Sequence, residues 1–185
     1  MFFRKSSVEP LPVTMTAVGR GDRVLQVGVD DPTMVTALAA KAGMSGLAVV
    51  AVSTEADAAR VRAAGAKAGV LLEVHVAAAP LPVEDGAFDL VVVHRAQDVL
   101  GAQVPADAAA QAREWRRALR PAGRVVTIES HPPTGLGALL GGRKVENPAP
   151  EGAIVSLLEA AGFRPVRALG EREGLSFAEG LKSST

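Results

Sequence analysis

Side chains that could bind a substrate follow the strongest strand-like segment of the sequence, residues 88–93. His94 and Arg95 come directly after it, Asp98 lies one helical turn beyond His94, and His131 follows the next predicted strand. An open parallel sheet binds its ligands at the carboxyl ends of its strands, so these groups could orient an acidic or phosphate-bearing substrate. Polar residues also fill the rim of such a sheet without any function, and the sequence leaves both interpretations open.

The sequence predicts neither a metal site nor a nucleophilic active site. It contains no cysteine, and its three histidines are isolated from one another, without the spacing of metal ligands. No Gly-x-Ser-x-Gly elbow and no Gly-x-Gly-x-x-Gly turn follows a predicted strand, which disfavours hydrolases and dehydrogenases.

Composition limits the partners that we expect. Lys and Arg together number 20 and so do Asp and Glu, so no net field would draw the chain to nucleic acid or to a membrane surface. No apolar segment reaches membrane-spanning length. The lack of cysteine favours a reducing compartment, and we predict a cytoplasmic protein. The single tryptophan, Trp115, is expected to pack in the core rather than against a base.

Short apolar segments alternate with longer segments of helical composition. This alternation predicts an α/β fold in which helices connect parallel strands. Asp31 followed by Pro32, and Thr54 followed by Asp57, are typical of helix starts. The predicted strands are residues 23–29, 47–52, 70–76, 88–93 and 124–129, with two more meeting at Glu173–Gly174, and the predicted helices are residues 32–42, 55–64, 107–119 and 152–161.

The length of 185 residues favours one domain over residues 1–185. Within it we expect an N-terminal extension at residues 1–20. Residues 131–150 concentrate proline and glycine, which predicts a loop over one end of the sheet. A long loop at that place is a candidate for ligand binding.

Three segments resemble the class I S-adenosylmethionine-dependent methyltransferases, in particular the type 11-like small-molecule group. Residues 81–92 follow the Leu-Pro-Phe-x-Asp-Gly-Ser-Phe-Asp signature of that group. Residues 112–126 are similar to its helix, Leu-x-Pro-Gly-Gly turn and next strand, and residues 157–163 to its last helix. The resemblance covers roughly residues 20–182. It implies a single-domain Rossmann-like fold: a seven-stranded, mostly parallel sheet with an antiparallel last strand and helices on both faces.

The resemblance also implies a binding site for the methyl donor. The positions that would border S-adenosylmethionine are Gly28, Asp30, Ser53, Ala79 and Leu81. Two of these depart from the family pattern, since Asp30 stands where the pattern has glycine and Ser53 where an acid would bind the ribose.

Three further positions depart from the same pattern. Pro32 replaces a glycine, Ala77 replaces the acid expected near adenine, and Gln26 replaces the first acid of the motif. Larger side chains obstruct close backbone approach, and each missing polar anchor weakens binding. These departures predict a degenerate cofactor motif.

Two hypotheses follow for the function. The favoured one is a methyltransferase-family protein with a degenerate S-adenosylmethionine site, which serves as a non-catalytic or altered-ligand binding or assembly module. The alternative is an active S-adenosylmethionine-dependent methyltransferase that acts on an unknown small molecule. Expected partners are a small molecule or a protein, and the sequence leaves a homo-oligomer open.

Overall fold

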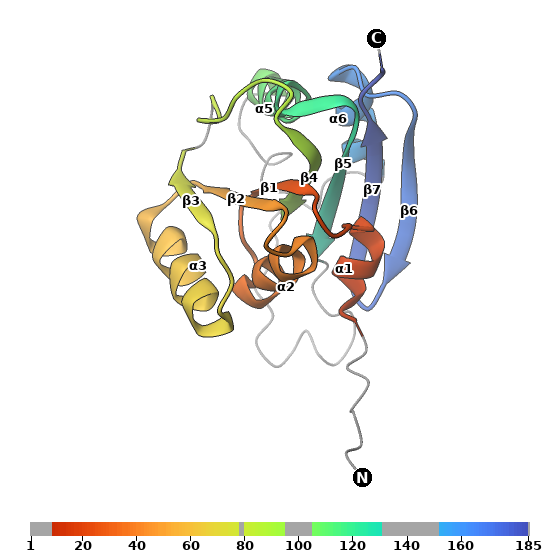
Figure 1. The fold of residues 1–185 in the computed structure, drawn as a ribbon. Coiled ribbons are helices and arrows are strands. Elements are labelled where there is room, and N and C mark those ends of the chain that lie inside the picture. Colours follow the sequence, from red (N-terminus) through yellow and green to blue (C-terminus); the bar gives the residue numbers. More distant parts are fainter. Residues whose placement is uncertain (1–8, 78–79, 95–104, 131–151, 185) are drawn as a thin grey trace.

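The computed structural model of the chain describes residues 9–77, 80–94, 105–130 and 152–184. Within these residues one sheet contains all the strands, and helices pack against it (Figure 1). The strands are β1 (Arg23–Val27), β2 (Leu47–Val52), β3 (Glu73–Val76), β4 (Phe88–His94), β5 (Leu119–Ser130), β6 (Val166–Arg172) and β7 (Leu175–Leu181). The helices are α1 (Leu11–Thr16), α2 (Pro32–Ala42), α3 (Glu55–Ala68), α5 (Pro105–Ala118) and α6 (Ala153–Ala160).

The strand order of the described sheet is β3-β2-β1-β4-β5-β7-β6. Strands β1 to β5 run parallel to one another, and β7 runs antiparallel to both β5 and β6. The predicted α/β architecture, a seven-stranded sheet with an antiparallel last strand, is therefore confirmed. Because β1 to β4 are parallel, their carboxyl ends lie at one edge of the sheet, which we call the carboxyl edge.

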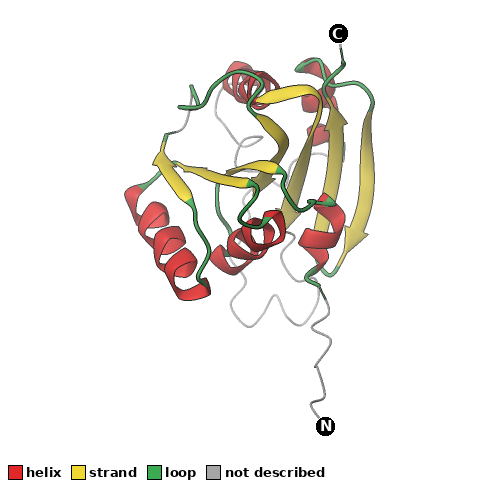
Figure 2. Ribbon diagram, viewed as in Figure 1, coloured by secondary structure: helices red, strands yellow, loops and turns green. Residues whose placement is uncertain are grey.

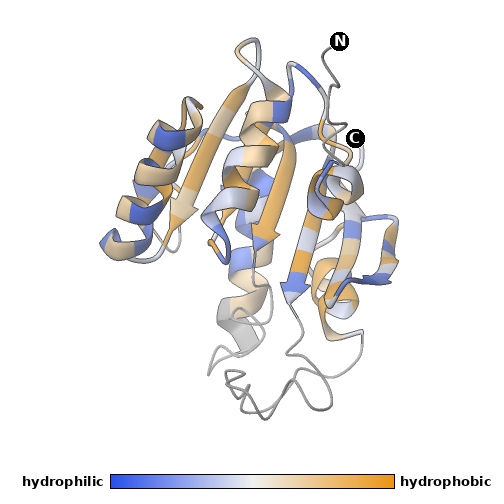
Figure 3. Cartoon of the chain, turned by 90° about the horizontal axis from the view of Figure 1, so that it is seen from below, coloured by the Kyte–Doolittle hydropathy of each residue, from blue (hydrophilic) through white to orange (hydrophobic). Residues whose placement is uncertain are grey.

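Helices cover both faces of the sheet, as predicted (Figure 2). Neighbouring residues of a strand point to opposite faces and both are buried. Val91 belongs to the core under α5 and α6, for example, while Leu90 and Val92 belong to the core under α1 and α2. A strand buried on both faces has a continuous apolar sequence, which explains the strand-like runs of valine and leucine. The central strands are accordingly mostly hydrophobic, whereas α3 carries both hydrophobic and hydrophilic residues (Figure 3).

Trp115 is the largest of the fully buried side chains and lies in the core under α5 and α6, 1% exposed. Its predicted packing role is confirmed. Residues 9–20, which we expected as part of an extension, include the short helix α1. Its Val13 is buried in the core under α1 and α2, and Arg124 of β5 donates to the carbonyl oxygens of Thr16 (2.9 Å) and Ala17 (2.7 Å).

The end predicted for the second long helix was wrong. We expected it to stop near Gly65, but α3 continues to Ala68 and ends at Gly69, whose φ of 66° is the left-handed conformation that glycine favours. Gly65 instead lies in close contact with the following segment, since a Cβ there would lie 2.9 Å from Cδ1 of Leu72 and 3.3 Å from the carbonyl oxygen of Val70. The following strand is correspondingly short and begins at Glu73 rather than at Val70.

Among the residues that the structure describes, no helix combines the length and hydrophobicity required to cross a bilayer.

Candidate functional site

The carboxyl edge holds four of the residues predicted to bind a ligand. Gly28 and Asp30 follow β1, Ser53 follows β2, and His94 is the last residue of β4. Leu81 lies in the segment between β3 and β4. The other predicted site residues, Ala79, Arg95, Asp98 and His131, and the predicted loop at residues 131–150 lie outside the described residues.

Gly28 lets the turn after β1 approach β4 closely. Its φ is 75°, and a Cβ at this position would lie 2.9 Å from the backbone oxygen of His94. Its N–H donates to the carbonyl of Ala51 on β2 at 2.8 Å. A larger residue would therefore meet both backbone strain and a collision with main-chain atoms, which cannot move aside as a flexible side chain can.

The start of α2 is built as the sequence predicted. The side chain of Asp31 caps the helix, since its Oδ1 accepts from the N–H of Thr33 at 2.8 Å, and Pro32 is the first helical residue. The neighbouring Asp30 points to a different partner, because its Oδ2 accepts from the hydroxyl of Ser130 at 2.6 Å. Asp30 follows β1 and Ser130 ends β5, so this contact passes across the carboxyl end of β4, which lies between them.

A pair of buried polar side chains lies at the same edge. Gln26 of β1 is fully buried, and its Nε2 donates to the carbonyl of Val35 on α2 at 3.0 Å. Its Oε1 lies 3.0 Å from Nε2 of His94, which is 3% exposed. The amide of Gln26 thus has partners on both sides, and it links β1 to α2 and to β4.

This pairing determines the chemistry of the imidazole. Because the amide nitrogen of Gln26 donates to Val35, its oxygen must accept, so Nε2 of His94 carries the proton. Burial lowers the pKa of His94 to about 4, although the carboxylates of Asp30 and Asp31 oppose this shift. His94 is therefore a neutral side chain at neutral pH. Its Nδ1 is buried and has no hydrogen-bond partner among the described residues.

The acidic residues near the carboxyl end of β2 have partners on α3. Ser53 itself is exposed and carries no charge. Two residues on, Glu55 pairs with Arg62 at 2.5 Å, and Asp57 pairs with Arg60 at 3.0 Å. These carboxylates are therefore already engaged with cations of their own helix.

The end of β3 is also without a charged group. The N–H of Ala77 donates to the carbonyl of Val52 at 2.9 Å and so continues the pairing of β3 with β2. Its side chain is a methyl group and offers a ligand only van der Waals contact.

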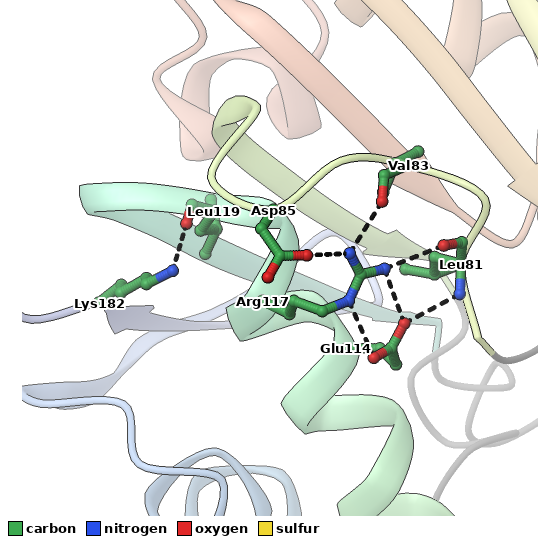
Figure 4. A network of polar contacts seen from close by, with 7 residues as sticks. All are labelled: Leu81, Val83, Asp85, Glu114, Arg117, Leu119 and Lys182. Carbon is green, nitrogen blue, oxygen red and sulfur yellow. Dashed lines mark hydrogen bonds and ion pairs between the residues drawn. The ribbon is translucent and has the colours of Figure 1, made fainter.

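Leu81 is held in place by a network that was not predicted from the sequence (Figure 4). Its N–H donates to Oε2 of Glu114 at 3.0 Å, and its carbonyl accepts from Nη2 of Arg117 at 2.9 Å. Arg117 also donates to the carbonyl of Val83 at 2.8 Å and to Oδ1 of Asp85 at 2.5 Å. We call these five residues the Arg117 cluster, and it fixes the segment from Leu81 to Asp85 against α5.

The electrostatics of the Arg117 cluster agree with its geometry. The hydrogen bond from Arg117, together with its positive charge, lowers the pKa of Glu114 despite partial burial, and Glu114 in turn raises the pKa of Arg117. The only signal in the sequence was an acid and a base three residues apart on a predicted helix, which most often form a simple surface pair.

The signature residue Asp89 has a structural role at the opposite edge of the sheet. Its Oδ2 accepts from the N–H of Arg23 at 2.7 Å, and its other oxygen pairs with the guanidinium of Arg120. Burial opposes its ionisation, but these two partners hold its pKa below the usual value. The contact joins the start of β1 to β4 and gives the acid of this segment a structural role.

Within the described residues, no group of three or more His, Asp or Glu side chains could hold a metal ion.

Comparison with known proteins agrees with this architecture. Residues 25–127, more than half of the chain, match the family described as "Methyltransferase domain". A search of curated proteins found no match.

Solved structures share the fold at low sequence identity. An S-adenosylmethionine-dependent methyltransferase from Aquifex aeolicus is 17% identical, with 91% of this chain and 86% of that chain covered and a TM-score of 0.68. The YcgJ protein from Bacillus subtilis is 12% identical, with 94% and 97% covered and a TM-score of 0.67. The cyclase SpnF is 16% identical, with 95% and 79% covered and a TM-score of 0.67. Identities this low show a common fold and nothing further.

Proposed function

Since the chain belongs to the methyltransferase domain family, we propose that it keeps the scaffold of that family with an altered donor site and acts as a ligand-binding or assembly module. Membership of the family implies S-adenosylmethionine as the expected ligand. The residues at the carboxyl edge fit this ligand poorly.

The main support for this proposal is that no acid stands at the end of β2. A carboxylate at the end of this strand would be needed to accept hydrogen bonds from both ribose hydroxyls of the donor. Ser53 occupies the place, and Glu55, the nearest acid along the chain, is engaged with Arg62 at 2.5 Å. That pair is exposed and contributes little to stability, but Glu55 lies in the first turn of α3, two residues beyond the place where the ribose-binding acid is expected.

Two further features support an altered site. Gln26 replaces the first acid of the motif, and its amide is already engaged with Val35 and His94. Asp30 is bound to Ser130 across the end of β4. Each hydrogen bond that a buried ligand group fails to make costs about 1–3 kcal/mol. Two such losses weaken donor binding by about 30-fold to about 2 × 10⁴-fold if they add.

The alternative is an active S-adenosylmethionine-dependent methyltransferase with a small-molecule acceptor. The observation in its favour is Gly28, which keeps the close turn after β1 with a φ of 75°. Asp30 and Asp31 would also place negative charge near the cationic groups of the donor. In such a reaction the protein mainly aligns donor and acceptor, so the absence of catalytic side chains would not exclude it.

The fold is compatible with both candidates. Its structural neighbours include proteins named as methyltransferases and one named as a cyclase. A scaffold of this kind can therefore serve more than one activity, and ligand binding has to be measured.

Calorimetry with S-adenosylmethionine and S-adenosylhomocysteine tests the proposal. We expect no heat of binding at millimolar ligand, whereas micromolar affinity would support the enzyme. If the native protein shows no binding, Ser53→Asp should produce measurable binding of S-adenosylhomocysteine. Ser53→Asn should not, because asparagine has nearly the same size as aspartate but carries no charge. Equal results for the two variants would show that the missing carboxylate is not what limits donor binding.

A further inference from the structure

The imidazole of His94 has one ring nitrogen that the described part of the protein does not use. The side chain is 3% exposed, and its Nδ1 is buried without a partner among those residues. A buried acceptor that forms no hydrogen bond is unfavourable, and most such groups in folded proteins find a partner. An unused acceptor at the ligand-binding edge of a parallel sheet therefore calls for an explanation.

The neighbouring contacts make Nδ1 an acceptor and nothing else. Gln26 donates to Val35 through its Nε2, and this orients its oxygen toward Nε2 of His94 at 3.0 Å. The ring proton therefore stays on Nε2, and Nδ1 presents a lone pair. Rotation of the ring would leave both the amide oxygen and the ring N–H without partners, so the imidazole is held in one tautomer.

Among the described residues, the charges that act on this ring are negative. Asp30 and Asp31 both act on His94 electrostatically, and both follow β1 immediately beyond the close approach of Gly28 to the backbone of His94. Among the residues described, no lysine or arginine forms an ion pair with either carboxylate, while Asp31 caps α2 and Asp30 binds Ser130. A ligand that donates a hydrogen bond and carries positive charge would match this environment.

We infer that Nδ1 of His94 accepts a hydrogen bond from the protonated amine of a small organic ammonium ligand, with Asp30 and Asp31 supplying the complementary charge. The inference rests on the proposed function, since it specifies the kind of ligand that an altered site would bind. It differs from donor binding because the contact requires neither a ribose nor the acid that Gln26 replaces.

His94 acts in this proposal as an orienting acceptor rather than as a general base. The pKa of about 4 that burial gives the imidazole makes it a weak base at neutral pH. A proton accepted by Nδ1 would also create a buried cation beside the N–H that donates to Gln26. The ammonium ligand therefore keeps its proton and donates it only as a hydrogen bond.

Nitrogen-15 NMR of the histidine rings tests the inference on the whole protein. His94→Phe identifies the His94 signals among those of the three histidines, and His75→Gln, on β3, identifies the signals of a histidine that pairs with Glu73. We expect Nδ1 of His94 to be unprotonated in the free protein. Addition of n-butylammonium at constant pH should shift the Nδ1 resonance toward the value of a hydrogen-bonded nitrogen.

Two probes separate the hydrogen bond from general effects. Tetramethylammonium carries the charge without an N–H and should leave Nδ1 unchanged, and n-butanol donates without a charge and should bind more weakly. Asp30→Asn keeps an oxygen for Ser130 but removes the charge, and it should lower the affinity for n-butylammonium by up to about fivefold. His94→Phe should weaken it about tenfold or more.

Several results would overturn the inference. The first is a proton on Nδ1 in the free protein. The second is an Nδ1 resonance that already has the value of a hydrogen-bonded nitrogen and does not shift when n-butylammonium is added. The third is a shift of the Nδ1 resonance with tetramethylammonium as large as the shift with n-butylammonium. Micromolar binding of S-adenosylhomocysteine would instead overturn the proposed function. The two failures are distinguishable because they involve different ligands and different atoms.

Discussion

Replacement of Arg117 by methionine should destabilise the protein by breaking the Arg117 cluster. The guanidinium donates to the carbonyl oxygens of Leu81 (2.9 Å) and Val83 (2.8 Å) and twice to Glu114 (3.0 and 2.9 Å). Methionine keeps much of the apolar stem but none of these donors. The variant leaves the carbonyl groups of Leu81 and Val83 without this donor and Glu114 without its cation, with only the N–H of Leu81 still bound to that carboxylate (Figure 4).

The size of the effect follows from these contacts. The side chain of Arg117 is 28% exposed and that of Glu114 is 21% exposed, so solvent weakens each interaction. We assign about 1 kcal/mol to each carbonyl bond and a similar value to the Glu114 pair, with nothing for Asp85, which is 80% exposed. Arg117→Met should therefore lower the free energy of unfolding by about 2–4 kcal/mol, equivalent to roughly 5–15 °C in Tm.

The pH dependence gives a second measure of the same contact. The hydrogen bond from Arg117 lowers the pKa of folded Glu114 below its ordinary value of 4.5. A depressed carboxyl pKa contributes stability above the unfolded pKa, and this stability is lost as the pH falls through the folded pKa. The difference between the native protein and Arg117→Met should therefore shrink below pH 4.5.

Urea denaturation at about pH 7 and about pH 3.5 measures both quantities. Arg60→Met is a matched control, since Arg60 is a 53% exposed residue of α3. It pairs with Asp57 of the same helix and donates to the backbone oxygen of Asp30 at 3.4 Å. We expect Arg60→Met to lower the free energy of unfolding by less than about 0.5 kcal/mol. Equal losses for Arg117→Met and Arg60→Met, or a difference that stays constant with pH, would refute the role given to the Arg117 cluster.

Three further predictions concern the carboxyl edge. Gly28→Ala should cost about 2–4 kcal/mol in urea denaturation, because it combines a φ of 75° with a collision at 2.9 Å, while Gly69→Ala, with a φ of 66° and open space, should cost only about 1–2 kcal/mol. Gln26→Leu should cost about 1–3 kcal/mol in the same assay, because it leaves the buried ring N–H of His94 unpaired and removes the side-chain donor to the carbonyl of Val35. The pKa of His94 is about 4 in the folded chain, and it takes the ordinary value of 6.5 in the unfolded chain. Between these pH values the unfolded chain therefore binds more protons than the folded chain. The free energy of unfolding should fall by up to about 3 kcal/mol as the pH drops from 6.5 to 4. His94→Phe should remove that part of the pH dependence, and an unchanged profile would contradict a buried neutral imidazole.

Local patterns in the sequence were sufficient for most of the fold. The N-caps at Asp31 and Thr54 were predicted correctly because a cap depends only on the two or three residues that follow it. The end of α3 was not, because the sequence offered two glycines and only tertiary packing distinguishes them. Gly65 makes room for Leu72, while Gly69 adopts the left-handed conformation that ends the helix.

The candidate site depended much more on the tertiary structure. The sequence placed Gly28, Asp30, Ser53 and His94 at the ends of strands, and the carboxyl edge contains all four. It predicted Gln26 and His94 separately, as a motif position and as a substrate candidate, and did not pair them. They lie 68 positions apart, and only the register of β1 against β4, in which Gln26 lies beside Val92, brings them into contact.

The sequence by itself determined the α/β architecture, the helix starts and the resemblance to methyltransferases, because apolar periodicity and capping are interactions among near neighbours in the chain. The tertiary structure alone decided which polar groups have partners. Burial, strand register and the position of α5 engage Gln26 with His94 and Glu114 with the N–H of Leu81, and they leave Nδ1 of His94 without a hydrogen-bond partner among the described residues. These choices depend on contacts between distant segments, which no local pattern encodes.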